Sequence, residues 1–295
     1  MVHVRERRVI WEFGLAFVKL IVAAAVVYGV FVGYLYTIQR RILFVPGTLP
    51  PDRIEAGVPD MREVDLVTED GLTLRSWYRP ADPGCPTLVY FQGNAGTIAG
   101  RGFKARAFLD RGLGVLLVGH RGFGGNPGHP SEIGLITDGR AALNFLASET
   151  VGPGDVVLYG ESLGSGVAVA LAADAEIPVG AVILEAPYTS IVEIAATRYW
   201  FVPVAMLLKD RFDSLSRISG VRAPVLILHG EDDKVINVDQ GRRLHEAAVE
   251  PRRLHLFEQG RHSDLYEHGA AEVIEAFLDE MWDISHAHKA PLFGP

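Results

Sequence analysis

The stretch Val156-Val157-Leu158-Tyr159-Gly160-Glu161-Ser162-Leu163-Gly164 decides the fold. Its four leading apolar residues predict a buried strand, and small residues that suit a tightly packed helix follow the second glycine. Gly160 and Gly164 allow close backbone approach, so Ser162 stands on a sharp strand-to-helix turn. A serine hydroxyl is a weak nucleophile that needs such a position and a neighbouring base. The pattern predicts a nucleophilic Ser162; the alternative is a serine that only caps the helix.

Short apolar runs alternate with helical stretches on both sides of this turn. This alternation indicates an α/β fold with a mostly parallel, doubly wound sheet that is buried on both faces. Before it, two alternating stretches flank Glu69-Asp70-Gly71 and predict an antiparallel hairpin over residues 63–68 and 72–78. The other predicted strands are 87–91, 115–118, 156–159, 179–184 and 225–228, and the predicted helices are 98–111, 131–148, 162–173, 238–248 and 264–281.

The chain divides into four predicted parts. Residues 1–41 form a basic flank and an apolar anchor, and residues 42–61, which contain several prolines, form a linker. Residues 62–285 form the α/β domain, and 286–295 form a C-terminal tail. Within the domain, residues 188–210 interrupt the alternation with an aromatic cluster around Trp200. That segment is either ordinary helix packing or a small apolar cap over a pocket.

Residues 20–38, LIVAAAVVYGVFVGYLYTI, contain no charged side chain. As a helix they would be about 28 Å long, close to the hydrocarbon core of about 30 Å. Tyr residues and the Arg40-Arg41 pair suit a membrane interface after this stretch, while Lys19 can extend to the other interface. The sequence therefore predicts a single transmembrane helix; a cleaved signal peptide and a buried core helix are the alternatives.

Charge is distributed unevenly along the chain. Residues 1–41 carry a balance of +4, whereas the whole chain carries −8, so the remaining residues carry −12. An acidic domain argues against a nucleic-acid partner, because phosphate binding needs clustered cations. Four basic residues precede the apolar stretch and three follow it. Because basic residues are enriched on the cytoplasmic side of a transmembrane helix, this count favours a cytoplasmic N-terminus. We therefore expect the domain on the outer, non-cytoplasmic side.

A nucleophile of this kind needs a base and an acid, and both follow Ser162 in the chain. Asp233 comes directly after the apolar run 225–228, with Asp232 as the alternative, and His262 follows another apolar run at 254–257. Side chains at the carboxyl ends of parallel strands meet at one edge of the sheet. An imidazole there can take the serine proton and return it to a leaving group. The sequence predicts a site built from Ser162, His262 and Asp233.

Acyl transfer also requires N–H donors that stabilise an oxyanion. The amide of Leu163, directly after the nucleophile, is one expected donor. The second is expected from the loop Gln92-Gly93-Asn94-Ala95-Gly96, where we favour Asn94 over Ala95; the alternative is a simple strand-to-helix turn. The chain contains no CxxC pair, HExxH motif or P-loop lysine, so we expect neither a metal nor a cofactor.

Together these segments resemble the α/β-hydrolase superfamily, and within it the ABHD-type single-pass membrane hydrolases related to serine aminopeptidases. The resemblance covers roughly residues 62–278 and implies a Ser162, Asp233 and His262 triad. It departs where the family usually has His-Gly-Asn-Ala-Gly but this chain has Gln92, and where Gly119-His120 replace a Tyr or Asp-Tyr. The matching segments are residues 92–96, 121–124, 160–164, 184–190, 229–233 and 260–262.

The leading functional hypothesis is a serine hydrolase that cleaves ester or thioester bonds of small-molecule or lipid-like acyl substrates near a membrane. A serine peptidase of the aminopeptidase type is the nearest alternative, because the same triad cleaves amides. A catalytically silent, membrane-tethered interaction protein is a third. Because a fold does not fix its substrate, the substrate class rests on the resemblance.

Overall fold

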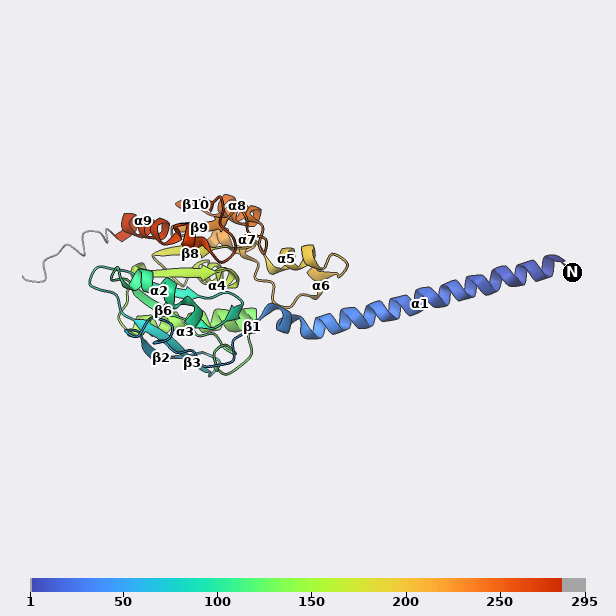
Figure 1. Cartoon of the computed structure of the whole chain (residues 1–295), viewed down its shortest axis with the longest axis horizontal. Helices are drawn as coiled ribbons and strands as arrows, with labels where there is room; N and C mark the ends of the chain where they lie inside the picture. Colours follow the sequence, from blue (N-terminus) through green and yellow to red (C-terminus); the bar gives the residue numbers. More distant parts are fainter. Residues whose placement is uncertain (1, 283–295) are drawn as a thin grey trace, which may run out of the picture.

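The computed structural model describes residues 2–282, with side chains from residue 11 onward. A body of sheet and helices lies at one end, and helix α1 (Val2–Leu43) leaves it as a single long rod (Figure 1). The predicted tail at 286–295 lies outside the described residues.

The body is built on one eight-stranded sheet in the order β10-β9-β8-β7-β4-β6-β3-β2. Neighbouring strands are parallel except at β3, which runs antiparallel to both β2 and β6. The predicted N-terminal hairpin and the mostly parallel sheet are thus present. The strands are β2 (Arg62–Val67), β3 (Thr73–Arg79), β4 (Thr87–Phe91), β6 (Gly114–Leu117), β7 (Val156–Glu161), β8 (Ala181–Glu185), β9 (Val225–Gly230) and β10 (Arg252–Phe257).

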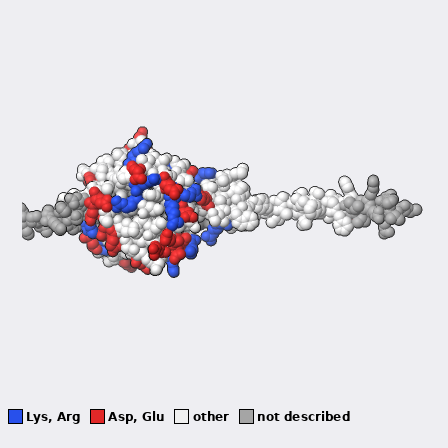
Figure 2. All heavy atoms as spheres, turned by 90° about the horizontal axis from the view of Figure 1, so that it is seen from above, with Lys and Arg blue, Asp and Glu red and all other residues white. Residues whose placement is uncertain are grey.

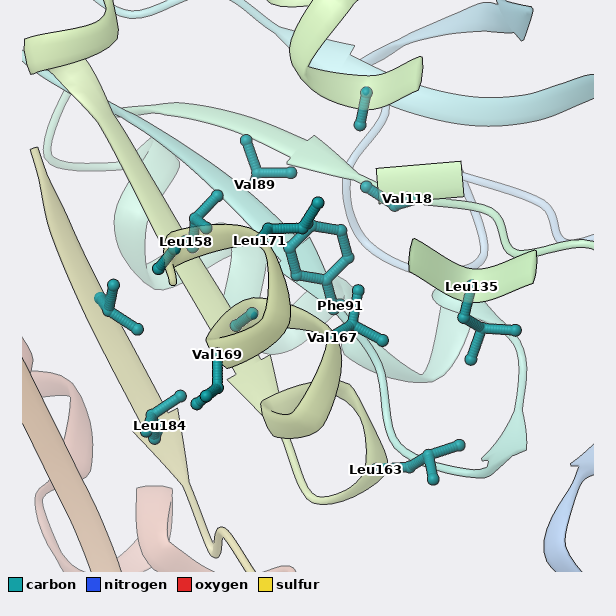
Figure 3. Packing of buried hydrophobic residues seen from close by; sticks show 14 of the residues in the cluster. Val89, Phe91, Val118, Leu135, Leu158, Leu163, Val167, Val169, Leu171 and Leu184 are labelled. Atoms are coloured by element: carbon teal, nitrogen blue, oxygen red, sulfur yellow. The ribbon is translucent and has the colours of Figure 1, made fainter. Parts of the chain in front are cut away.

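Helices cover both faces of this sheet, which explains why its central strands are continuously apolar. One core layer packs α3, α4 and α8 on the sheet, and the other packs α2 and α9. Figure 3 shows Val167 and Leu171 of α4 lying close to Phe91 of β4 in the first layer. These helices are α2 (Gly102–Leu109), α3 (Glu132–Ser148), α4 (Leu163–Ala172), α8 (Val238–Ala247) and α9 (Ala270–Trp282).

Short elements complete the connections between the layers. They are α7 (Ser214–Arg217) and the 3-10 turns η1 (Ile98–Arg101), η2 (Pro153–Asp155), η3 (Ile218–Gly220) and η4 (Leu265–His268).

Helix α1 contains a candidate membrane span, Trp11–Leu43, with a mean hydropathy of 2.5 in its most apolar window, none of which is buried. The helix continues through Leu43, two residues beyond the anchor boundary predicted at residue 41. Directly after it, β1 (Val45–Pro46) pairs in parallel with β5 (Ala95–Gly96), which lies in the loop after β4. The exit of the helix is therefore attached to the body.

The segment predicted at 188–210 forms α5 (Ile191–Arg198) and α6 (Val204–Leu207), which project from the body alongside α1 (Figure 1). We call residues 188–210 the cap. Trp200 and Met206 are 82% and 86% exposed, so they are not core residues of the body. On the face drawn in Figure 2, charged side chains of both signs cover the body, whereas the described part of α1 is almost free of them.

Candidate active site

Ser162 stands on a strained turn between β7 and α4. Its backbone has φ 49° and ψ −116°, a region that serine rarely adopts. A Cβ on Gly160 would come within 2.5 Å of the Ser165 Cα, and one on Gly164 within 2.0 Å of the Phe91 carbonyl oxygen. Only glycine fits at both positions, so the sequence around Ser162 forces the sharp turn that raises its hydroxyl above the sheet.

The three side chains predicted to meet do so at the carboxyl edge of the sheet. The His262 Nε2 lies 2.9 Å from the Ser162 Oγ, and its Nδ1 lies 2.7 Å from the Asp233 Oδ2. Asp233 follows β9 and His262 follows β10, so three separate strand ends supply the groups. The Asp233 carboxylate is fully buried, and the imidazole is 18% exposed.

Backbone amides hold the Asp233 carboxylate in its orientation. Its Oδ1 accepts the N–H groups of Val235 at 2.7 Å and Ile236 at 2.9 Å, and the His229 Nε2 lies 3.4 Å from Oδ2. Burial raises the pKa of Asp233, but hydrogen bonds with His229 and His262 outweigh burial and hold that pKa well below its usual value. The carboxylate is therefore ionised and accepts a hydrogen bond from the Nδ1–H of His262. In this tautomer the ring Nε2 carries no proton and can accept the Ser162 proton.

Of the two predicted oxyanion donors, Leu163 directly follows Ser162, and Asn94 follows Gly93, whose added Cβ would lie 3.5 Å from the Ser162 Cβ. Leu163 is the first residue of α4, where a backbone N–H has no carbonyl partner within the helix. The Asn94 side chain is already used, because its Nδ2 donates to the Leu43 carbonyl at 2.8 Å. The Asn94 carbonyl accepts the Val45 N–H at 2.8 Å. Its backbone N–H is thus the group that Asn94 can offer, as an amide-built oxyanion hole requires.

A buried network of charges lies beneath the turn, and the sequence reasoning missed it. The Lys104 Nζ lies 2.8 Å from both Glu185 carboxylate oxygens and 3.3 Å from Glu161, which also accepts from Arg101 at 2.7 Å. The Glu185 carbonyl accepts the Ser162 N–H at 2.8 Å. The network therefore fixes the positions of Glu161, which precedes Ser162 in the chain, and Glu185, whose carbonyl accepts the Ser162 N–H.

Tyrosine hydroxyls complete this network. Tyr90 donates to Glu161, and Tyr159 donates to Glu185 at 2.5 Å. Burial raises the pKa of Glu161, but Lys104 and Arg101 outweigh burial and lower that pKa to about 2. Lys104 itself sits on the buried face of α2 beside Ala105 and Phe108. A lysine in such a position was the available signal, since buried lysines are almost always paired.

Gln92, which differs from the residue usual in the family, is 1% exposed. Among residues 11–282, whose side chains the structure describes, neither its side-chain oxygen nor its nitrogen has a hydrogen-bond partner, and the same holds for both ring nitrogens of His120. Within that same part of the chain, no group of three or more His, Cys, Asp or Glu side chains is arranged to hold a metal ion.

Comparison with known proteins places the chain in a family. The family model described as serine aminopeptidase, S33, matches residues 87–216 and 208–269. An uncharacterized protein of Mycobacterium tuberculosis, MT2364, is 38% identical over 246 residues, which cover 82% of this chain and 86% of that protein. The lysophosphatidylserine lipase ABHD12 of Danio rerio is 33% identical over 224 residues, 70% of this chain and 58% of that protein.

The fold has a close match among solved structures. An esterase of Pyrococcus furiosus aligns with a TM-score of 0.66 at 15% identity, over 81% of this chain and 98% of that one. Its similarity bears on the fold alone. The family model matches more than half of the sequence, and the relatives include ABHD-type proteins. Together with the fold, these matches show that the chain belongs to the serine aminopeptidase S33 family of α/β hydrolases and is of the ABHD type.

Proposed function

We propose that this hydrolase is a membrane-anchored serine esterase that cleaves carboxylic ester or thioester bonds through an acyl-enzyme. The observation that carries the proposal is the unbroken hydrogen-bonded chain from the Ser162 Oγ through His262 to the buried Asp233 carboxylate. Each group has the partner its role requires, and the base is partly exposed to substrate and water.

In the proposed reaction, the Ser162 Oγ forms a bond to the substrate carbonyl carbon while its proton passes to the His262 Nε2. Asp233 stabilises the resulting imidazolium, and the amides of Leu163 and Asn94 donate to the oxyanion. The bond to the leaving oxygen or sulfur then breaks, and that atom takes the proton from Nε2. Water repeats the sequence on the acyl-enzyme, which releases the acid and restores Ser162.

Two features favour esters of lipid-like acids over soluble substrates. The apolar helix α1 is a candidate membrane span attached to the body next to the loop of Asn94. In addition, the similar protein from Danio rerio is named a lysophosphatidylserine lipase. We therefore propose an acyl ester of a membrane lipid or a related amphiphile as the substrate class.

A fluorophosphonate probe tests the nucleophile directly. The full-length protein should be labelled on Ser162, and Ser162→Ala should not be labelled. Ser148→Ala, which removes an exposed serine at the end of α3, serves as the matched control and should label like the wild type. Equal labelling of Ser162→Ala and the wild type would refute the assignment. An unlabelled wild type would favour the silent interaction protein.

Peptidase activity is the second candidate, because the matching family is described as serine aminopeptidase. Parallel assays with p-nitrophenyl esters of increasing chain length and with aminoacyl p-nitroanilides separate the two. We expect ester cleavage to exceed amide cleavage in kcat/KM. The reverse order would replace the esterase proposal with a peptidase.

We also propose that the catalytic body lies on the non-cytoplasmic side of the membrane, as the distribution of basic residues around the apolar stretch favours. A protease added to intact cells or spheroplasts should then digest the body. Complete protection until the membrane is permeabilised would place the body inside.

A further inference from the structure

An apolar cavity of about 350 Å³ lies between α1 and the cap. Its size falls within the range of about 300–1,000 Å³ that small-molecule sites occupy. Helix α1 supplies one wall, and α5, α6 and the turn between them supply the other. Among the wall residues are Val32, Leu35 and Ile42 of α1 and Ile194, Val202 and Leu207 of the cap.

The wall on α1 is a single helix face. Val32, Leu35, Gln39 and Ile42 all line the cavity, at intervals of three or four residues that bring side chains onto one side of a helix. From Val32 to the last lining residue, Leu43, the helix rises about 16 Å at about 1.5 Å per residue. The cavity is thus elongated along the helix, in a shape that suits a long alkyl chain.

The cavity is lined in part by the loop beside the candidate catalytic centre. Asn94, the proposed oxyanion donor, belongs to its lining. A methyl group built on the adjacent Gly93 would come 3.5 Å from the Ser162 Cβ, so this loop separates the cavity from the nucleophile by one residue's width. Neither Ser162 nor His262 belongs to the lining, so the carbonyl end of a chain held in the cavity has to extend past this loop to reach the Ser162 hydroxyl.

The tip of the cap contacts the part of α1 that is a candidate membrane span. The Tyr28 hydroxyl donates to the Phe201 carbonyl at 2.7 Å, and the Phe31 and Phe201 rings lie 6.2 Å apart. Tyr28 and Phe31 belong to the charge-free stretch 20–38, so a helix that spans the bilayer there carries Phe201 into the apolar layer. The exposed side chains of Trp200 and Met206 extend from the same tip. Aromatic and apolar side chains of this kind are favoured at a membrane interface.

Polar contacts hold α1 against the cap. Arg40 binds the buried Asp210 through two hydrogen bonds, of 2.7 and 3.1 Å. The Gln39 side chain accepts the Lys209 N–H at 2.8 Å and donates to the Leu207 carbonyl at 3.3 Å. The helix therefore has a defined position on the cap rather than a loose attachment.

From these contacts we infer that α1 is a wall of the substrate site as well as an anchor. The site takes the long acyl chain of a bilayer lipid ester, which enters from the membrane between α1 and the cap tip and presents its carbonyl to Ser162. This inference rests on the proposed esterase function and extends it, because it names the surface that holds the chain and the direction from which the substrate arrives.

A bifunctional probe tests the inference on the full-length protein in phosphatidylcholine vesicles. The probe is a fluorophosphonate with a hexadecyl chain that carries a diazirine near its far end. After the phosphonate has reacted with Ser162, light should join the chain to peptides from residues 32–43 and from the cap. A phosphonylated Ser162 without any photo-adduct on residues 32–43 would refute the inference but leave the esterase proposal standing. Without phosphonylation of Ser162, the esterase proposal itself falls.

A variant pair gives an independent kinetic test. Leu35→Trp fills the cavity from the α1 side, whereas Val30→Trp places the same bulk at a 69% exposed position of the helix that does not line the cavity. We expect Leu35→Trp to lower the ratio of kcat/KM for p-nitrophenyl palmitate to that for p-nitrophenyl acetate by about tenfold or more, since steric exclusion of chain carbons has this size. Val30→Trp should leave the ratio unchanged. Equal ratios in both variants and the wild type would overturn the inference.

Discussion

Replacement of Lys104 by methionine should destabilise the protein by about 3–5 kcal/mol at pH 7, because loss of one partner leaves a buried charge uncompensated. The Lys104 Nζ lies 2.8 Å from both oxygens of Glu185, and the two side chains are 5% and 0% exposed. Tyr159 still donates to Glu185 in the variant, so we expect the lower end of this range. Methionine keeps nearly the length of the lysine chain, so the loss reports on charge rather than on a cavity.

The same variant should lose less stability than the wild type when the pH falls. Burial raises the pKa of Glu161, but Lys104 and Arg101 outweigh burial and lower that pKa from its ordinary 4.5 to about 2. Between these two values the unfolded chain binds more protons than the folded one. The stability that ionised Glu161 contributes is therefore present above about pH 4.5 and is lost as the pH falls toward 2. Removal of Lys104 raises the folded pKa of Glu161 and narrows this interval, so the variant should lose less stability between pH 4.5 and pH 2 than the wild type.

Urea unfolding of the full-length protein in detergent micelles, followed by near-UV circular dichroism at pH 7 and at lower pH, measures both effects. Arg253→Met is the matched control, because Arg253 pairs with Glu280 at the surface, where the side chains are 47% and 53% exposed. Such a pair contributes at most about 1 kcal/mol. If Lys104→Met unfolds within 1 kcal/mol of the wild type at pH 7 and loses as much stability as the wild type at lower pH, the network does not brace the turn as described.

Further predictions concern the turn and the proposed triad. Gly164→Ala should lower stability by about 1–3 kcal/mol and abolish fluorophosphonate labelling, because its Cβ would lie 2.0 Å from the Phe91 carbonyl oxygen. Gly154→Ala, where nothing lies within 4 Å of the new Cβ, is the control for thermal unfolding and labelling, and equal behaviour of the two variants would contradict the argument. Asp233→Asn should lower kcat for p-nitrophenyl esters by roughly 10³–10⁴-fold with little change in KM, since the amide no longer fixes the His262 tautomer. A fall of less than tenfold would remove Asp233 from the proposed mechanism.

The fold could be predicted from the sequence because each of its elements depends on residues that are close together in the chain. Strands, the hairpin turn and the glycines around Ser162 depend on neighbouring residues, and the carboxyl ends of parallel strands must share one edge. That rule, together with the order of acid and base after the serine, predicted Asp233 and His262 beside Ser162, although His262 lies 100 residues further along the chain. Strand order did not enter the prediction, and it was not needed to bring the three ends together.

The charge network and the position of the cap could not be predicted, because they depend on contacts between residues far apart in the chain, and local sequence patterns do not indicate such contacts. Nothing near Lys104 in the sequence indicates Glu185, 81 residues away, as its partner. Likewise, residues 188–210 read equally well as core packing or as a cap, because an aromatic cluster has the same composition in both. The exposure of Trp200 and the contact of Phe201 with α1 distinguish them in the structure.

The short parallel pairing of β1 with β5 has a mechanical consequence. Because Val45 and Leu43 are hydrogen-bonded to Asn94, the emerging rod and the loop beside the nucleophile move as one piece. The body therefore keeps a fixed orientation relative to the rod. With α1 across a membrane, a thicker or thinner bilayer that changes the tilt of the rod would turn the candidate active site with it.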